Sequence, residues 1–222
     1  MKAIILTDDT SSQLPTHNKW SNRFGIGSII SKNPSIINIF KKEKIELPSN
    51  DYENEERYKQ ILHDFVRPAR NMFGGRFSEI RYFEEELKKI ASVETFIISG
   101  RYGLLEGDTE IIPYYFSIKT ITQLKTYDKE HHFLEKLISV IPGTTHLIIL
   151  LPKIYVEYFI KQCFFDRISQ KIKIIVVSSK EFDVELKKYA NVTLLERKGV
   201  SRLRNQNCDK ILAIFQDNKS QS

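Results

Sequence analysis

The chain has little cysteine, glycine or tryptophan. Its 222 residues include 2 Cys, 9 Gly and 1 Trp. Cys163 and Cys208 are far apart and fit no metal-ligand spacing, which excludes a disulfide-stabilised scaffold and a zinc site built on thiolates. His131 and His132 are adjacent, and neighbouring positions of a helix point in different directions, so this pair would chelate poorly. We predict no metal site, and the sequence indicates no particular cofactor.

Long apolar runs are also missing. No stretch approaches the ~18 to 20 apolar residues that a membrane-spanning helix needs. The apolar start of the chain, MKAIILTDDT, is interrupted at Asp8 and Asp9, so no secretory signal peptide is predicted. We therefore expect a cytoplasmic protein that does not interact with a membrane.

The charge balance favours the positive sign. Lys and Arg outnumber Asp and Glu by 34 to 28, which gives a formal net charge of +6. Such an excess favours anionic partners, here nucleic acid or a phosphate-bearing small molecule. A lysine-rich and isoleucine-rich composition without any such partner is the alternative. The hydrophobic fraction of 41% and the charged fraction of 28% are typical of a globular protein.

Short apolar runs alternate with segments of helical periodicity. The runs that resemble buried strands are 2–7, 95–99, 145–151, 171–179 and 191–196. The helical segments between them are 77–91, 152–164 and 178–190. This alternation predicts an α/β fold, with a mostly parallel central sheet and helices on both of its faces.

The chain is expected to form a single α/β domain over residues 1–216. A region of about 11–50 contains several prolines and no clean period, and we interpret it as a long irregular insertion that could act as a lid. The following segment, 51–70, is predicted to be a helix that ends near Pro68. The polar tail 217–222 is expected to be frayed.

Polar residues follow the first two predicted strands. Asp8 and Asp9 come directly after the first strand, and Ser99 follows the second. The carboxyl ends of parallel strands meet at one edge of the sheet, which is where ligands bind in open α/β sheets. Asp8 and Asp9 are therefore the best candidates for a catalytic acid or base, although a surface turn is the alternative for at least one of them.

The loop after the second of these strands, ISGRYGLLEGDTEIIPYY at 98–115, is unusually rich in special residues. Gly100 and Gly103 permit a positive φ and close backbone approach. Arg101 has a forked donor suited to carboxylate or phosphate, and Tyr102 could stack on a base. The loop predicts an anion or nucleotide pocket, and the alternative is a structural turn whose tyrosines cover the sheet edge. The candidate ligand-binding residues are Ser99, Gly100, Arg101, Tyr102, Gly103 and Tyr114, together with Arg70 and Arg76.

The same loop resembles a known family. Its pattern S-G-x-Y-G-L-L, followed by a short acidic turn and I-x-P-Y, is similar to the signature of the YaaA peroxide-stress family, and ARNMFGGRF at 69–77 resembles that family's upstream aromatic-glycine turn. After P-Y the family usually has Arg-Leu-Glu-Met-Gly, whereas residues 115–119 read Tyr-Phe-Ser-Ile-Lys, which is closer to uncharacterised relatives of the family. The resemblance implies a cytoplasmic α/β protein associated with DNA binding and oxidative-stress protection, without an established reaction.

Basic residues gather in two further places. The stretch 197–210 is the densest basic patch, and a second cluster brackets the aromatic-glycine turn. Either could contact phosphates and release counterions, and a solvated surface is the alternative. The candidate nucleic-acid-binding residues are Arg67, Arg197, Lys198, Arg202 and Arg204.

Three functions remain open from the sequence. The first is a YaaA-like protein that binds DNA through a basic, tyrosine-rich cleft between the 69–77 turn and the 98–115 loop, with a role in oxidative-stress protection. The second is an enzyme that acts on a nucleotide, nucleoside or nucleobase in the same cleft. The third is a structural or partner-binding domain in which the tyrosine loop is only architecture. Whether the protein is an enzyme is not decided by its sequence.

Overall fold

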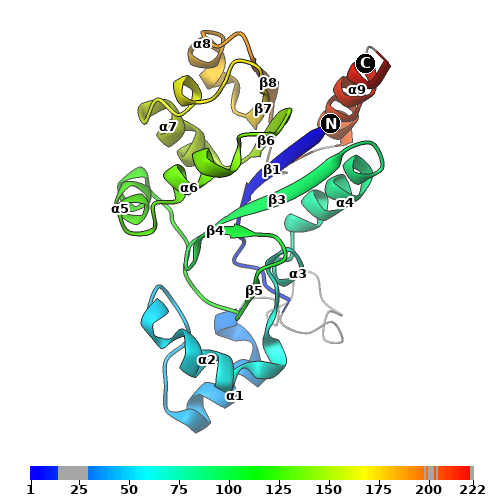
Figure 1. Cartoon of the computed structure of the whole chain (residues 1–222). Coiled ribbons are helices and arrows are strands. Elements are labelled where there is room, and N and C mark those ends of the chain that lie inside the picture. The colour runs from blue at the N-terminus through cyan, green and yellow to red at the C-terminus, as the bar shows by residue number, and fades with distance from the viewer. Residues whose placement is uncertain (15–29, 198, 200–202, 204, 221–222) are drawn as a thin grey trace.

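The computed structural model describes residues 1–14, 30–197, 199, 203 and 205–220. Within them a six-stranded sheet has the order β4-β3-β1-β6-β7-β8 (Figure 1). Its strands are β1 (Lys2–Asp8), β3 (Ser92–Ser99), β4 (Gly103–Glu106), β6 (His146–Leu150), β7 (Lys173–Ser178) and β8 (Val192–Glu196). All neighbours pair in parallel except β4, which runs antiparallel to β3. The prediction of an α/β fold with a mostly parallel central sheet is confirmed.

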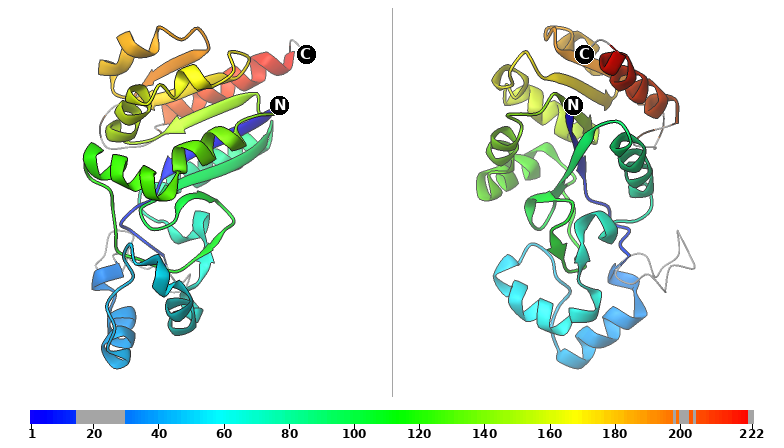
Figure 2. Two further views of the ribbon diagram at one scale, coloured as in Figure 1. Left: turned by 60° about the vertical axis from the view of Figure 1, so that its left-hand side comes forward. Right: turned by 45° about the vertical axis from the view of Figure 1, so that its right-hand side comes forward.

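Helices cover both faces of this sheet because the side chains of a strand alternate between its faces. In β1, Ala3 and Ile5 are buried on one side, whereas Ile4 and Leu6 are buried on the other. The first side packs against α3 (Ala69–Met72), α4 (Phe77–Lys88) and α9 (Asn205–Ser220). The second packs against α5 (Ile121–His131), α6 (Phe133–Val140), α7 (Lys153–Lys161) and α8 (Asp183–Leu186), as the two views of Figure 2 show.

A helical insertion lies beyond the carboxyl edge of the sheet, at the bottom of Figure 1. It contains α1 (Pro34–Glu43) and α2 (Glu55–Ile61), and a short antiparallel pair, β2 (Arg67–Pro68) and β5 (Glu110–Ile111), joins it to the rest. It has its own apolar cluster, which includes Ile36, Phe40, Leu62 and Ile112. Among the described residues, the 3-10 helices are η3 (Ile30–Lys32), η4 (Tyr52–Asn54), η5 (His63–Phe65), η6 (Phe165–Arg167) and η7 (Lys180–Phe182).

The insertion is more regular than the sequence suggested. The region expected to be irregular contains α1, which begins because the Asn33 side chain accepts hydrogen bonds from the backbone N–H groups of Ser35 and Ile36. Pro34 is the first residue of the helix, where its fixed φ is suitable and its missing N–H has no cost. Residues 15–29 of the same region lie outside the described part of the chain.

Two predicted helices are shorter than expected, and a helix reaches into the tail. The segment 51–70 is divided into η4, α2 and η5, and it ends before Pro68 because that ring disfavours helical backbone at the preceding residue. The segment 178–190 contains only η7 and α8. Conversely, α9 continues to Ser220, so four residues of the tail expected to be frayed are helical.

The strand order creates a switch point next to β1. The chain passes from β1 through α4 to β3 on one face, and then through α5 and α6 on the other face to β6. The two connections leave in opposite directions, and the crevice at such a point is where open α/β sheets bind their ligands. Within the described residues, none of the helices combines the length and the apolar character that crossing a membrane requires.

Candidate functional site

Three of the predicted residues form a buried chain of hydrogen bonds at the carboxyl edge. The Tyr114 hydroxyl donates to Oδ2 of Asp9, which also accepts from the Gly100 N–H at 2.7 Å. A phenol has one proton to donate, so at its 2.8 Å contact with Ser99 Oγ the tyrosine accepts and the serine donates. Ser99 Oγ accepts in turn from the backbone N–H groups of Arg101 and Tyr102, both at 3.1 Å. The ends of β1 and β3 are thereby tied to the 98–115 loop.

The tyrosine at the centre of this chain is a fixed donor. Tyr114 is 1% exposed, and burial together with the neighbouring Asp9 carboxylate raises the pKa of its hydroxyl well above the ordinary value. Its backbone is held by Gln13, whose side chain accepts from the Tyr114 N–H at 2.9 Å and donates to the Tyr114 carbonyl at 2.6 Å. Its ring meets Phe73 edge-on. Tyr114 therefore positions the loop, and its hydroxyl stays protonated near neutral pH.

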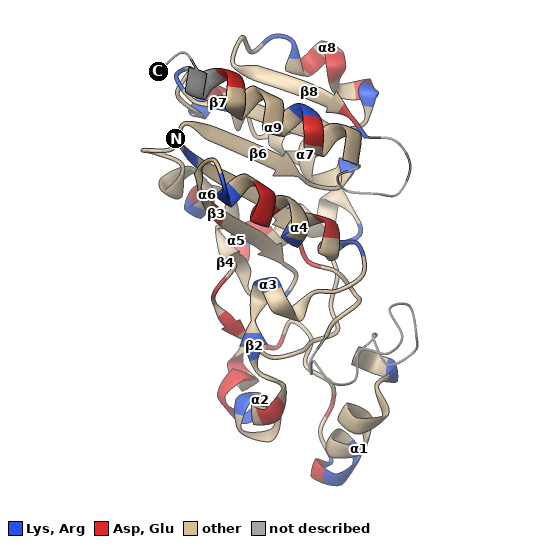
Figure 3. Ribbon diagram, turned by 90° about the vertical axis from the view of Figure 1, so that its right-hand side faces the viewer, with Lys and Arg blue, Asp and Glu red and all other residues tan. Residues whose placement is uncertain are grey.

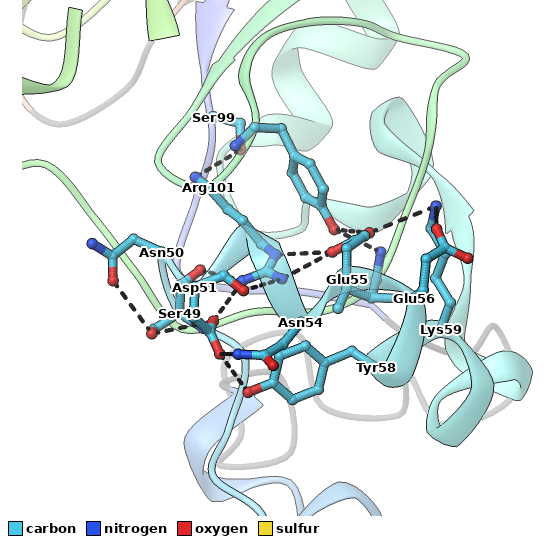
Figure 4. A network of polar contacts seen from close by, with 12 residues as sticks. Ser49, Asn50, Asp51, Asn54, Glu55, Glu56, Tyr58, Lys59, Ser99 and Arg101 are labelled. Carbon is cyan, nitrogen blue, oxygen red and sulfur yellow. Dashed lines mark hydrogen bonds and ion pairs between the residues drawn. The ribbon is translucent and has the colours of Figure 1, made fainter. Parts of the chain in front are cut away.

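Arg101 is placed differently from its neighbours in the motif. It is 0% exposed, and its guanidinium points into the insertion (Figure 4). Nε and Nη2 donate to the Glu55 carboxylate at 3.1 and 2.9 Å, and Nη1 donates to Asp51 Oδ1 at 2.7 Å. Two backbone carbonyls, those of Ser49 and Asp51, complete the set at 2.7 and 3.3 Å. These contacts use all five N–H donors of a guanidinium, so in this conformation Arg101 clamps the insertion to the sheet and offers no donor to an anion.

The Arg101 clamp is lined by tyrosines. The guanidinium carbon lies 5.9, 5.4 and 5.6 Å from the ring centres of Tyr52, Tyr58 and Tyr102, within the range of cation–π attraction. The Tyr102 hydroxyl donates to Glu55 at 2.9 Å, and the Tyr58 hydroxyl donates to Asp51 at 2.6 Å. Burial and the Asp51 carboxylate raise the pKa of Tyr58 to about 12. Tyr102 therefore secures the insertion, which accounts for its ring without invoking a stacked base.

Two carboxylates balance the buried guanidinium. The Asp51 and Glu55 side chains are 25% and 6% exposed. Burial alone would raise the pKa of Asp51, but hydrogen bonds from the Tyr58 hydroxyl, the Ser49 N–H and Arg101 outweigh burial and lower the pKa to about 2. Asp51 is consequently ionised across the physiological pH range.

Gly103 has the positive φ that its position in the motif suggested. Its φ is +76°, and its N–H donates to the Tyr127 hydroxyl at 2.8 Å. That hydroxyl donates onward to the Ser99 carbonyl at 2.5 Å, which connects α5 to the end of β3. A Cβ at Gly103 would lie 3.1 Å from Cβ of His131. Sterics and backbone conformation both favour glycine here.

The arginines near the aromatic-glycine turn do not form one cationic pocket with the loop. The turn itself does lie beside it, since the ring of Phe73 in the turn meets the ring of Tyr114 in the loop edge-on. However, Arg67 donates to the Leu14 carbonyl, and Arg70 is bound to Glu84 at 3.0 Å and to Asp108 at 2.7 Å. Arg76 is exposed in the turn that precedes α4. The cationic pocket expected between turn and loop is thus not assembled by Arg67 and Arg70 in this structure.

The remaining candidates are separated from the Asp9–Tyr114 pair. Asp8 is 8% exposed and lies at the end of β1, on the opposite side of the strand from Asp9. Arg197 follows β8, where its N–H donates to the Ser178 carbonyl at 2.7 Å. Lys198, Arg202 and Arg204 lie outside the described residues. No group of three or more His, Cys, Asp or Glu that could hold a metal ion occurs in the described part of the chain.

A cavity of about 220 Å³ adjoins the site, between the segment after β1 and the end of the 98–115 loop. Its lining combines hydroxyls, aromatic rings, two carboxamides and one lysine: Ser11, Gln13, Tyr114, Tyr115, Phe116, Ser117, Lys119 and Gln123. Since one water occupies about 30 Å³ of liquid, a cavity of about 220 Å³ has the volume of about seven waters. Gln123 is fixed by the capping box of α5, where it accepts from the N–H groups of Lys119 and Thr120.

Sequence reasoning did not identify several residues that build this site. Asp51 and Glu55 could have been identified from the sequence, because two carboxylates four residues apart and close to Tyr58 are expected on one face at the start of a helix. Gln13 and Lys119 carry none, since each acquires its role only when 11–13 and 114–119 are brought together by the sheet.

Comparison of the chain with protein-family models, with curated proteins and with solved structures found no match. The YaaA-like character of the 98–115 loop therefore stays a prediction. The geometry of the site is what bears on function.

Proposed function

We propose that the chain binds a nucleotide, nucleoside or nucleobase in the cavity between residues 11–13 and 114–123. The observation that carries this proposal is the position of the cavity, at the carboxyl edge of β1 beside the switch point, where open α/β sheets bind such ligands. Aromatic rings of Tyr115 and Phe116 on its wall suit the face of a base. Lys119 supplies a cation for a phosphate.

The buried chain of hydrogen bonds supports this binding by holding the loop in place. Asp9, Ser99 and Tyr114 satisfy one another, and Gln13 fixes the Tyr114 backbone on the cavity wall. These groups act as positioning residues in the proposal. A rigid wall lowers the entropic cost of binding, because the loop is already ordered before the ligand arrives.

Calorimetric titration of the full chain with nucleosides and their monophosphates tests the proposal. We expect the monophosphate to bind more tightly than its nucleoside, and Lys119→Ala to reduce that preference about fivefold, the equivalent of ~1 kcal/mol for an exposed charge contact. Lys125→Ala is the matched control, since Lys125 is exposed on α5 outside the cavity. Absence of binding by every nucleoside and nucleotide would refute the proposal, as would equal losses in the two variants.

Binding of duplex DNA, with a role in oxidative-stress protection, is the second candidate. It is favoured by the YaaA-like loop and by the net charge of +6. Affinity for mixed-sequence duplex should then fall steeply between 50 and 200 mM salt, by about a thousandfold or more if six phosphates are contacted. A shallow dependence on salt in an anisotropy titration would argue against this candidate.

A further inference from the structure

A groove lies next to the cavity and shares one lining residue with it. This groove, of about 590 Å³, lies on the insertion. Apolar side chains of α1 and of the segment after it line the groove, with two lysines among them: Ser31, Ile37, Phe40, Lys41, Lys44, Ile45, Glu46, Leu47, Ser49 and Tyr115. Tyr115 lines both the cavity and the groove. The cavity and the groove therefore lie on either side of one shared side chain.

Tyr115 is available for contact from outside. The residue is 54% exposed, although its backbone is anchored by a 2.7 Å hydrogen bond from its N–H to the Pro48 carbonyl. In the part of the chain that the structure describes, its ring packs against no other aromatic ring. An anchored, exposed ring between two hollows provides a platform for stacking.

The charges along this path are mainly positive. Lys119 lies at the cavity, and Lys41 and Lys44 lie at the groove, opposed within the two linings only by Glu46. All three lysines are exposed. Figure 3 shows the basic positions at the end of α1, away from the sheet. Lys41 lies in the last turn of α1, Lys44 is the residue that caps this helix, and both line the groove.

We propose that the cavity and the groove together bind a short single-stranded segment of nucleic acid. This inference rests on the proposed function of the cavity and names its ligand class. One base occupies the cavity, the next stacks on Tyr115, and the backbone follows the lysines toward α1. Stacking rings beside a positively charged groove are the features by which proteins hold single strands. A cavity of about 220 Å³ suits one base better than a base pair, so we expect the strand to be unpaired where it enters.

Anisotropy and calorimetry with thymidine monophosphate and an oligothymidylate of about eight nucleotides test this inference on the full chain. The oligomer should bind more tightly than the mononucleotide. Replacing both Lys41 and Lys44 by Ala should make the slope of log affinity against log salt shallower by about 1.4. The ratio of the affinity at 50 mM salt to the affinity at 200 mM salt should then be about sevenfold smaller than in the native chain. Mononucleotide affinity should not change.

Two controls separate the groove from general electrostatics and from folding. Lys42→Ala removes the same charge from the same helix at an exposed position outside the groove, and it should leave the slope unchanged. Tyr115→Ala should weaken oligomer binding about fivefold or more, whereas Tyr115→Phe keeps the ring and should retain the affinity.

The possible failures are distinguishable. If the mononucleotide binds and depends on Lys119, but the oligomer binds no more tightly, the single-strand inference is wrong and the proposed function stands. Equal effects of the groove variant and Lys42→Ala would also overturn the inference. If duplex competes as well as single strand, the unpaired entry is refuted. If neither mononucleotide nor oligomer binds, the proposed function fails, and the inference fails with it.

Discussion

Removal of the Arg101 charge should release the insertion from the sheet. In Arg101→Met, the apolar length of the side chain is kept, but Asp51 and Glu55 lose the cation that both of them contact. Breaking a buried ion pair by removing one partner costs about 3–5 kcal/mol. For a chain of this size, each kcal/mol lowers the melting temperature by roughly 2–4 °C, so a fall of about 6–20 °C is expected if unfolding stays cooperative.

The insertion is also expected to open locally, because the clamp is what joins residues 49–55 to the end of β3. Hydrogen exchange followed by mass spectrometry should show faster exchange across α2 in Arg101→Met, while exchange in β1 and β6 changes little. Lys59→Met is the matched control, since its 3.9 Å contact with Glu55 is at the surface and is worth at most ~1 kcal/mol.

A rescue variant makes this reasoning refutable. Adding Asp51→Asn and Glu55→Gln to Arg101→Met removes the uncompensated charges and should restore part of the lost stability. The reasoning is wrong if the free energy of unfolding of Arg101→Met lies within ~1 kcal/mol of the native value and the amides of α2 exchange at the native rate. The clamp then does not hold the insertion. If the rescue variant is no more stable than the single variant, buried charge is not the cause of the loss.

The remaining predictions concern backbone conformation and pH. Gly103→Ala should destabilise the chain by about 1–2 kcal/mol in denaturant titrations, since a left-handed φ is costly for alanine and its Cβ would lie 3.1 Å from Cβ of His131. Stability should fall as pH is lowered from about 5 toward 2, because the folded pKa of Asp51 is about 2 and lies below its ordinary value. Burial, together with the charges of Lys173 and the N-terminal amine, lowers the pKa of His146 to about 4. A second loss of stability is therefore expected as the pH falls from about 6.5 to 4. His146→Phe should remove this second loss in thermal melts across pH and keep the ring contact with Phe215.

The sheet was predictable because its strands are buried on both faces and so appear as continuous apolar runs. The runs at 2–7 and 171–179 correspond to Lys2–Asp8 and Lys173–Ser178. The short strand β4 was not predicted, since LLE after the Gly103 turn resembles loop sequence. The sequence feature that predicts the start of α1 is Asn33 followed by Pro34. This feature is easily overlooked because the same region contains other prolines.

The candidate site was predictable only in part. The joint placement of Asp9, Ser99 and Tyr114 follows from the rule that parallel strands end at one edge, and the motif contributes the tyrosine. The role of Arg101 was not predictable in the same way. Its chemistry suits a phosphate and a carboxylate equally, and only the folded chain shows that carboxylates 46 and 50 residues away are bound to it.

The pairing of β1 has a consequence for how this chain is made. Lys2 pairs with Ser92 and Ala3 pairs with His146, so both neighbours of the first strand are encoded far downstream. At roughly 5–20 residues per second, the ribosome needs about 5–18 s to extend the chain from the first strand to its nearer partner. During that time the apolar first strand has no partner at either edge. The insertion is also synthesised before Arg101, to which it docks. Synthesis in the cell should therefore depend on chaperones that shield the first ninety or so residues.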